Sequence, residues 1–185
     1  MIDNPRDAMG VALQYLGYSI NTTDREELQA AYDLLRSQKP ILQAYVMDQI
    51  FDKLEGGEAA MGVYYAGDFL AMKENNPNLA FAIPKEGANF FVDAMCIPKG
   101  ARNKAEGEAW INFMCSKDAS LANLDYIWYA SPNTQAMEEY MPELPPEDAA
   151  VLNPSKEKLA QCEMFLNLPQ DTLNLYDELW VLLKS

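Results

Sequence analysis

The chain has 185 residues, of which 49% are apolar and 23% charged, as in globular proteins with one sizeable core or two modest lobes. Its 14 Lys and Arg against 28 Asp and Glu give a net charge of −14. Nucleic acids and anionic membranes need clustered basic residues, so neither is an expected partner. Histidine is absent, which excludes His-based triads, His metal sites and imidazole pH switches.

The N-terminal part of the chain contains two helix signals. Asn4 supplies a capping side chain and Pro5 suits the first helical position, so a helix is predicted there, ending at Gly17. The stretch Thr23-Asp24-Arg25-Glu26 is typical of a capping box. It predicts a second helix, which Pro40 ends.

The rest of the chain alternates short apolar runs with helical patterns. Strands are predicted at residues 41–46, 59–65 and 79–83 and in the apolar run that begins at Phe90. Helices are predicted at 48–54, 66–73 and 106–114, and a further helix runs from a Ser116 cap to about 127. A final helix is predicted from the apolar stripe of Leu173, Tyr176, Leu179, Trp180 and Leu183. In helix 106–114, Trp110, Phe113 and Met114 are expected to face inward. This order predicts an α/β protein with a central sheet and helices on its faces.

The cysteines and the ends of the chain give weaker signals. Cys96 and Cys115 lie in apolar surroundings and are expected to be buried free thiols. A disulfide among them and Cys162 would leave one cysteine over. No signal peptide or bilayer-length apolar run is found, and the chain is expected to have been cut from something longer.

The segment from Ile83 to Pro98 is the most informative part of the sequence. A turn with Pro and Gly leads into an apolar run that one carboxylate, Asp93, interrupts. Phe91 and Asp93 are two residues apart, so on a strand they point to the same face. A ring beside a carboxylate suits an organic cation, whereas a buried, unpaired charge is costly. A plain interaction domain is the alternative, favoured if Asp93 pairs with a Lys or Arg of its own chain.

Aromatic residues also gather where predicted strands meet turns. They are Tyr64-Tyr65, Phe90-Phe91 and Trp128-Tyr129. Ligand crevices of open α/β sheets lie at such strand ends, although any single ring also fits a core. The three clusters, taken with Asp93 and Asp7, favour a binding site.

The sequence offers little for catalysis. It has no phosphate-binding Gly loop and no nucleophile elbow, and a Ser nucleophile would lack a His base. A carboxylate pair acting as a hydrolase on an α/β scaffold is the one enzyme class left open. No catalytic residue, metal ligand or cofactor is predicted.

Four elements, in this order and spacing, carry a family resemblance. They are Leu16 to Asp24 followed by a helix, Pro84 to Gly87 with Phe91-Val92-Asp93, Ala109 to Met114, and Tyr129 to Asn133. Together they resemble the spermidine/putrescine-binding proteins of bacterial ABC transporters, over nearly the whole chain but only about the C-terminal half of such a protein.

The resemblance implies a set of site residues. In this family a linear polyamine lies between two lobes, with rings along its methylenes and carboxylates at its ammonium groups. By position, the central carboxylate falls on Asp93, the ring beside it on Phe91, and further rings of the cleft on Tyr65 and Tyr129.

Two acids of the family's first helix fall on Asn4 and Asp7. Asp7 keeps a carboxylate, while Asn4 has lost the charge. The family often has Trp where this chain has the smaller rings of Phe91 and Tyr65. These smaller rings and the charge lost at Asn4 imply an altered amine preference or weaker binding.

The resemblance also implies the fold and setting. The expected fold is a type II periplasmic-binding-protein-like lobe, with a central mixed sheet flanked by helices and an incomplete second lobe. Residues 1–90 and 139–185 would form the C-terminal lobe, and 91–138 would belong to the N-terminal lobe.

The expected partners are a polyamine and the ABC permease subunits, at an extracytoplasmic location that is periplasmic or lipid-anchored. Because the bulk of the N-terminal lobe is missing, segment 91–138 is expected to expose apolar surface and to promote self-association. A receptor of the same fold for a different solute is the alternative, and Asp93 with Asp7 favours a cation.

Overall fold

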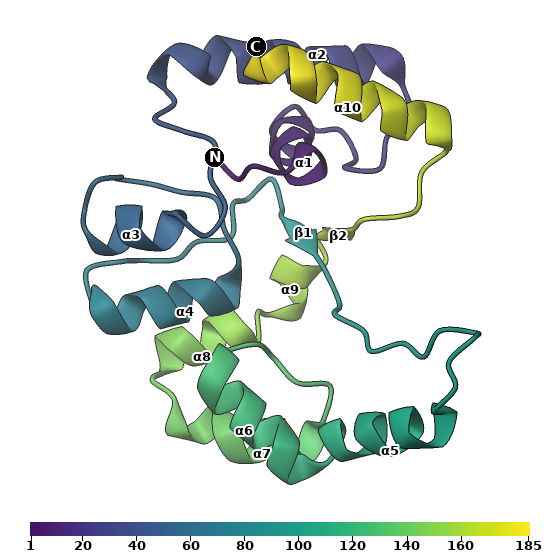
Figure 1. The fold of residues 1–185 in the computed structure, drawn as a ribbon. Coiled ribbons are helices and arrows are strands. Elements are labelled where there is room, and N and C mark those ends of the chain that lie inside the picture. The colour runs from purple at the N-terminus through teal and green to yellow at the C-terminus, as the bar shows by residue number, and fades with distance from the viewer. The chain divides into compact units, whose positions relative to one another are not determined.

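The computed structural model describes all 185 residues and divides them into two compact units. Unit 1 comprises Met1–Tyr64, Ala82–Phe91 and Ser155–Ser185, and unit 2 comprises Tyr65–Phe81 and Val92–Pro154 (Figure 1). None of the helices combines the length and apolar character that a membrane span requires.

Unit 1 is a helical layer with a very small sheet. Its elements are α1 (Pro5–Tyr15), α2 (Arg25–Gln38), the 3-10 turn η1 (Lys39–Ile41), α3 (Ile50–Glu55), β1 (Asn89–Phe90), α9 (Lys156–Leu159), β2 (Glu163–Met164) and α10 (Gln170–Lys184). Helices α1, α2 and α10 pack against one another, and α10 runs beside α2 in Figure 1. Their shared core is made of fully or nearly fully buried side chains, among them Met9, Leu13, Leu28, Leu35, Tyr176 and Leu183.

The helix ends of unit 1 follow local chemistry. The Asn4 side chain accepts hydrogen bonds from the first turn of α1, and Pro5 occupies its first position, as predicted. Helix α2 is capped by Asp24, whose carboxylate accepts from the N–H groups of Glu26 and Glu27. The predicted capping box therefore began one residue too early.

The sheet is much smaller than the predicted central mixed sheet. Strands β1 and β2 are parallel, with Asn89 opposite Glu163 and Phe90 opposite Met164. The strands predicted at 41–46, 59–65 and 79–83, and beyond Phe90, are absent, apart from one isolated bridge between Ile2 and Val46. Apolar runs form a ladder only where a neighbouring strand supplies its hydrogen-bonding partners, and these segments have no such neighbour in the chain.

Unit 2 is made of helices alone. They are α4 (Ala66–Asn75), α5 (Lys104–Met114), α6 (Lys117–Ile127), α7 (Thr134–Tyr140), the 3-10 turn η2 (Met141–Glu143) and α8 (Pro146–Leu152). Ser116 caps α6 as predicted, and Asn133 caps α7. Lys73 of α4 pairs with Asp148 of α8 at 2.5 Å, which joins two of the helices. The buried side chains of the unit include Phe69, Leu70, Leu124 and Leu152.

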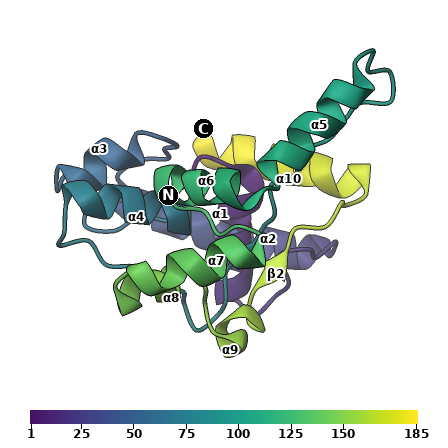
Figure 2. The same ribbon diagram turned by 90° about the horizontal axis from the view of Figure 1, so that it is seen from below.

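Helix α5 does not bury the face that its sequence predicts. Trp110 is 60% exposed and Phe113 is 56% exposed, and no residue of α5 is buried. In Figure 2 the helix projects away from α7 and α8 of the same unit. Cys96 and Cys115 are likewise exposed rather than buried. The helix itself forms as predicted, but the expectation that Trp110 and Phe113 face inward is wrong within this chain.

Candidate functional site

Asp7 and Asn89 form the polar centre of the candidate site residues in unit 1. Asp7 lies in the first turn of α1 and is half-buried. Its Oδ1 accepts a hydrogen bond of 2.9 Å from the side-chain Nδ2 of Asn89, in β1. Burial raises the pKa of the Asp7 carboxyl above its usual value, and the neighbouring Arg6 guanidinium partly opposes that rise.

Asn4 has a structural task in the same turn. Its Oδ1 accepts from the backbone N–H groups of Arg6 at 2.9 Å and Asp7 at 3.2 Å. The side-chain oxygen is therefore used to cap α1, and the amide nitrogen that remains can only donate. An ammonium group also only donates, so Asn4 supports the site by fixing the turn that carries Asp7.

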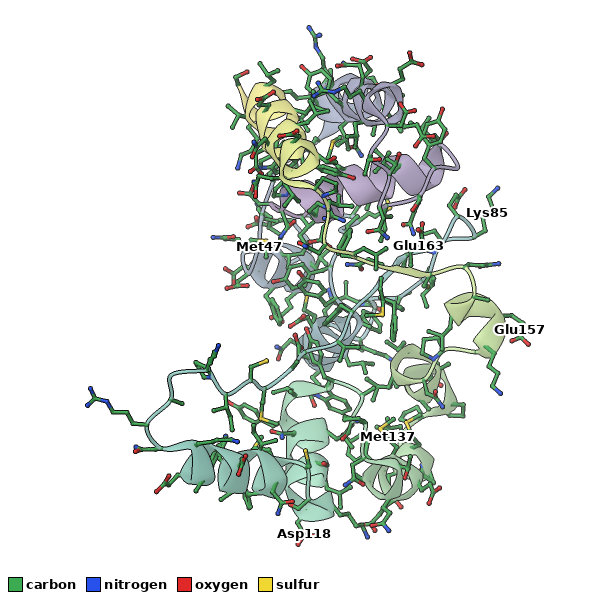
Figure 3. All side chains as sticks on the ribbon, turned by 90° about the vertical axis from the view of Figure 1, so that its right-hand side faces the viewer. Met47, Lys85, Asp118, Met137, Glu157 and Glu163 are labelled. Atoms are coloured by element: carbon green, nitrogen blue, oxygen red, sulfur yellow. The ribbon has the colours of Figure 1, made fainter.

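The C-terminal segment of unit 1 is tied to the loop after α1 by side chains. Glu163, labelled in Figure 3, accepts from the Ser19 hydroxyl and from the Ile20 N–H at 3.2 Å. Asn21 donates to the Met164 carbonyl at 2.7 Å and accepts from the Leu166 N–H at 2.8 Å. These bonds hold β2 against the elements that position Asp7.

Arg6 is an internal cation beside this segment. Its guanidinium lies 4.6 Å from the centre of the Phe165 ring and 5.1 Å from that of Tyr176. It also donates to Asn21 Oδ1 at 3.1 Å and to the Ile20 carbonyl at 3.3 Å. Arg6 thereby occupies two aromatic faces of unit 1 itself.

Phe91 follows β1 directly and is 39% exposed. The turn before β1 depends on Gly87, which has φ +106°, and a Cβ at this position would lie 2.1 Å from the Gln161 carbonyl oxygen. No other residue type fits so close a backbone approach. The site in unit 1 thus combines a carboxylate held by Asn89 with an accessible ring two residues further along.

In unit 2, Tyr129 and Asp68 form a direct pair. The Tyr129 hydroxyl donates to Asp68 Oδ2 at 2.8 Å, and Asp68 lies in the first turn of α4. Burial raises the pKa of the Tyr129 phenol well above its usual value, and the bond to Asp68 with the charges of Asp68 and Asp93 raises it further. Both carboxylates therefore lie close enough to act on this phenol.

The backbone of unit 2 is shaped to bring Tyr129 to α4. A Cβ on Gly67 would lie 2.5 Å from Tyr129 Cδ2 and 2.7 Å from the Trp128 carbonyl oxygen. Trp128 itself has φ 56°, a left-handed conformation that is uncommon outside glycine. The ring of Tyr129 can pack here only because residue 67 has no side chain.

The remaining predicted residues of unit 2 lie in the same neighbourhood. Asp93 is exposed, in a loop rather than on a strand, and Tyr65 is half-buried at the start of α4. Tyr65, like Asp93, is among the groups that act on Tyr129. The two charged groups that raise the pKa of this phenol, Asp68 and Asp93, are both carboxylates, which suits a cation.

Sequence reasoning missed two residues of these arrangements, Asp68 and Asn89. Asp68 is three residues after Tyr65, in the turn where a helix was predicted to start. Its position just after the end of the predicted strand 59–65 was a usable signal of a site residue. Asn89 is two residues before Phe91, the spacing that places strand residues on one face. No group of three or more Cys, Asp or Glu side chains in the described chain is arranged to hold a metal ion.

The comparisons with known proteins agree on one family. Residues 1–151 match the family model described as bacterial extracellular solute-binding protein. The chain is 30% identical over 185 residues to the spermidine/putrescine-binding periplasmic protein of Salmonella typhimurium, and this match covers 100% of the chain and 52% of that protein. The chain therefore spans about half the length of this relative.

Solved structures give the same result. The chain is 36% identical to a putative spermidine/putrescine ABC transporter protein from Listeria monocytogenes, with a TM-score of 0.88 over 100% of this chain and 56% of the other. The TpPotD lipoprotein of Treponema pallidum is 27% identical, with a TM-score of 0.79 over 99% and 56% of the two chains. These neighbours confirm the periplasmic-binding-protein-like fold class.

The names of these relatives also agree on location. One is periplasmic and another is a lipoprotein, which supports the extracytoplasmic location expected from the sequence. The family model covers most of the chain, and the structural matches cover all or nearly all of it. The chain belongs to the bacterial extracellular solute-binding proteins.

Proposed function

We propose that this chain is the C-terminal half of a polyamine receptor that delivers spermidine or putrescine to an ABC importer. The observation that carries the proposal is the pairing of the Tyr129 ring with two carboxylates, Asp68 through a hydrogen bond and Asp93 through its nearby charge. A linear polyamine presents ammonium groups separated by apolar methylenes. Carboxylates and aromatic faces are the protein groups that bind such a ligand.

Each unit by itself carries residues suited to such a ligand. In unit 1, Asp7 supplies a carboxylate and Phe91 an accessible ring. In unit 2, Asp93 supplies the main carboxylate for an ammonium group, and Tyr65 and Tyr129 supply rings. Asn4 acts through the cap of α1. We assign no catalytic step to any of these residues, because recognition of a cation needs only fixed charge and ring faces.

The lobe organisation is part of the proposal. Residues 1–90 and 139–185 form the C-terminal lobe, while 91–138 cross back to complete the N-terminal lobe. The compact units divide the chain within one residue of the boundary at 90, between Phe91 and Val92, but they also place Tyr65–Phe81 and 139–154 in unit 2, so the units and the proposed lobes are not the same division. The exposed rings of α5 support the assignment of 91–138 to the N-terminal lobe, because a helix with this apolar pattern needs a packing partner. The permease subunits of the importer are the expected protein partners.

The Asp93→Asn variant tests the assignment of the central carboxylate. In the full-length receptor, which joins this chain to its N-terminal lobe, we expect a loss of about 2–5 kcal/mol in polyamine binding, since an ammonium group would lose its charged partner. Calorimetry with spermidine and putrescine measures it. Asp118→Asn, at an exposed carboxylate on α6, is the matched control and should bind as the unchanged receptor does. Unchanged affinity in Asp93→Asn would remove the central assignment.

A comparison of the chain with the full-length receptor tests the half-site. Closure of two lobes around a ligand is the usual mechanism of such receptors. Spermidine should therefore raise the melting temperature of the full-length receptor and leave that of the 185-residue chain unchanged. A clear rise for the chain alone would mean that it holds a complete site. A neutral sugar should raise neither, and a rise with the sugar would favour a receptor for a different solute.

A further inference from the structure

We infer that Asn89 is a positioning residue of the binding site: its amide donates to the Asp7 carboxylate and fixes that carboxylate relative to the strand that leads into Phe91. The inference rests on the proposed function, because it concerns how unit 1 presents one carboxylate and one ring to an ammonium group.

The structure links Asn89 to both groups, by a side-chain hydrogen bond to Asp7 and through the backbone to Phe91. Its side-chain Nδ2 donates to Asp7 Oδ1 at 2.9 Å, and this is a contact between residues 82 positions apart. Its backbone belongs to β1, which pairs with Glu163 of β2 and leads directly into Phe91. Asn89 therefore joins the helix that carries the carboxylate to the segment that carries the ring.

The backbone around Asn89 is fixed from both sides. Gly87 approaches the Gln161 carbonyl so closely that no side chain fits, and the Glu163 N–H donates to the Ala88 carbonyl at 3.1 Å. Such a constrained strand can hold a side-chain donor at one distance from Asp7. A carboxamide on a free loop would not fix the distance in this way.

The charge balance at Asp7 explains why a donor is needed. Asp7 is half-buried, and burial favours the neutral carboxyl, which could not attract an ammonium group. An amide N–H donates to the ionised carboxylate and thereby favours it. Arg6 works in the same direction as the one neighbouring cation, but its guanidinium is engaged by Asn21 and the ring faces of Phe165 and Tyr176. Asn89 is the side chain that contacts the Asp7 carboxylate directly.

The Asn89→Leu variant removes the donor at nearly constant volume. In the full-length receptor we expect putrescine affinity to fall about tenfold, as for loss of a hydrogen bond to a charged group, and the loss to grow as the pH is lowered. In an Asp7→Asn background the same change should cost nothing further, because the carboxylate that it positions is gone. Asn103→Leu is the matched control, since Asn103 is exposed and makes no side-chain cap.

A second measurement needs no ligand. In the 185-residue chain, ¹³C NMR titration of the Asp7 carboxyl should show a higher pKa in Asn89→Leu and in Asn89→Asp than in the unchanged chain. Asn89→Asp keeps the shape of the side chain and replaces the amide donor by a carboxylate with the same charge as Asp7. It therefore takes the place of Asn89→Leu in the titration if Asn89→Leu does not fold.

The outcomes separate the inference from the function on which it rests. A receptor that binds neither putrescine nor spermidine contradicts the proposed function, and the titration then still tests Asn89. An unaltered Asp7 pKa, or unaltered affinity in a receptor that does bind, overturns the role of Asn89. A further loss in the Asp7→Asn background would assign Asn89 to general stability rather than to positioning, and would also overturn it.

Discussion

The two units of the chain differ in how completely they bury their apolar residues. In unit 1, helices α1, α2 and α10 enclose a continuous core, and Leu13 at its centre is 0% exposed. In unit 2, α4, α6 and α8 bury several side chains, yet the rings of α5 face outward. Both units carry residues of the candidate site. The two units therefore differ in how much of their apolar surface is buried within this chain.

The contrast also bears on the site. Unit 1 holds Asp7 through bonds that are all internal to that unit. Unit 2 pairs Tyr129 with Asp68 internally, but Asp93 lies in the exposed segment that leads to α5. We therefore expect the unit 1 half of the site to be in place in the isolated chain. We expect the Asp93 segment to be fixed only in the proposed full-length receptor, where the N-terminal lobe would pack against it.

The largest expected effect is on stability. Leu13→Ala should lower the free energy of unfolding of the chain by about 2–5 kcal/mol, because it leaves a cavity in a fully buried core. Phe113→Ala, an equally apolar truncation at an exposed place in α5, should change it by less than about 0.5 kcal/mol. Urea denaturation followed by circular dichroism measures both. Similar losses for the two variants would erase the contrast between the units.

A smaller effect is expected on association. Exposed apolar faces promote contact between copies, so the chain should self-associate, and the paired change of Trp110→Ser with Phe113→Ser should shift it toward the monomer. Sedimentation velocity at several concentrations measures this. Tyr15→Ser, at a 67% exposed ring of unit 1, is the control. If the control acts as strongly as the α5 variant, the surface responsible lies elsewhere.

The smallest expected effect concerns Asp7. Its pKa is raised in the folded chain, so the charged form destabilises unit 1 above the pKa that Asp7 has when unfolded. Asp7→Asn should raise the melting temperature slightly at pH 7, and this gain should vanish as the pH falls below about 3.8, the ordinary Asp value. Thermal melts across that range measure it, with Asp177→Asn on the exposed face of α10 as the control. A gain that persists in acid would have another cause.

Local signals in the sequence predicted the longer helices well, did not predict α7 and α9, and predicted the sheet poorly. Asn4-Pro5, Ser116 and the apolar stripe of α10 each act within a few residues, so the corresponding helices lie close to where they were expected. A strand depends on a partner far away in sequence or in another chain segment. The runs 59–65 and 79–83 have strand-like composition but no ladder, and composition alone could not show that.

The site residues show the same division. Asp7, Tyr129 and Asp93 could be named from residue types and a family resemblance. The pairs Tyr129–Asp68 and Asp7–Asn89 could not, because they join residues 61 and 82 positions apart through the folded backbone. The capping role of Asn4 was predicted from the sequence, because it depends only on the residues of the first turn, and the structure confirms it.

The contacts between the two ends of the chain set an order of events during synthesis. Lys184 pairs with Asp3 at 2.6 Å, 181 positions away, and α10 contributes much of the core around α1. Unit 1 therefore cannot complete its core until the last helix has left the ribosome, whereas every residue of unit 2 has been made by Pro154. A stop codon ahead of α10 would remove Tyr176, Leu179 and Leu183 from the core of unit 1 without removing any residue of unit 2.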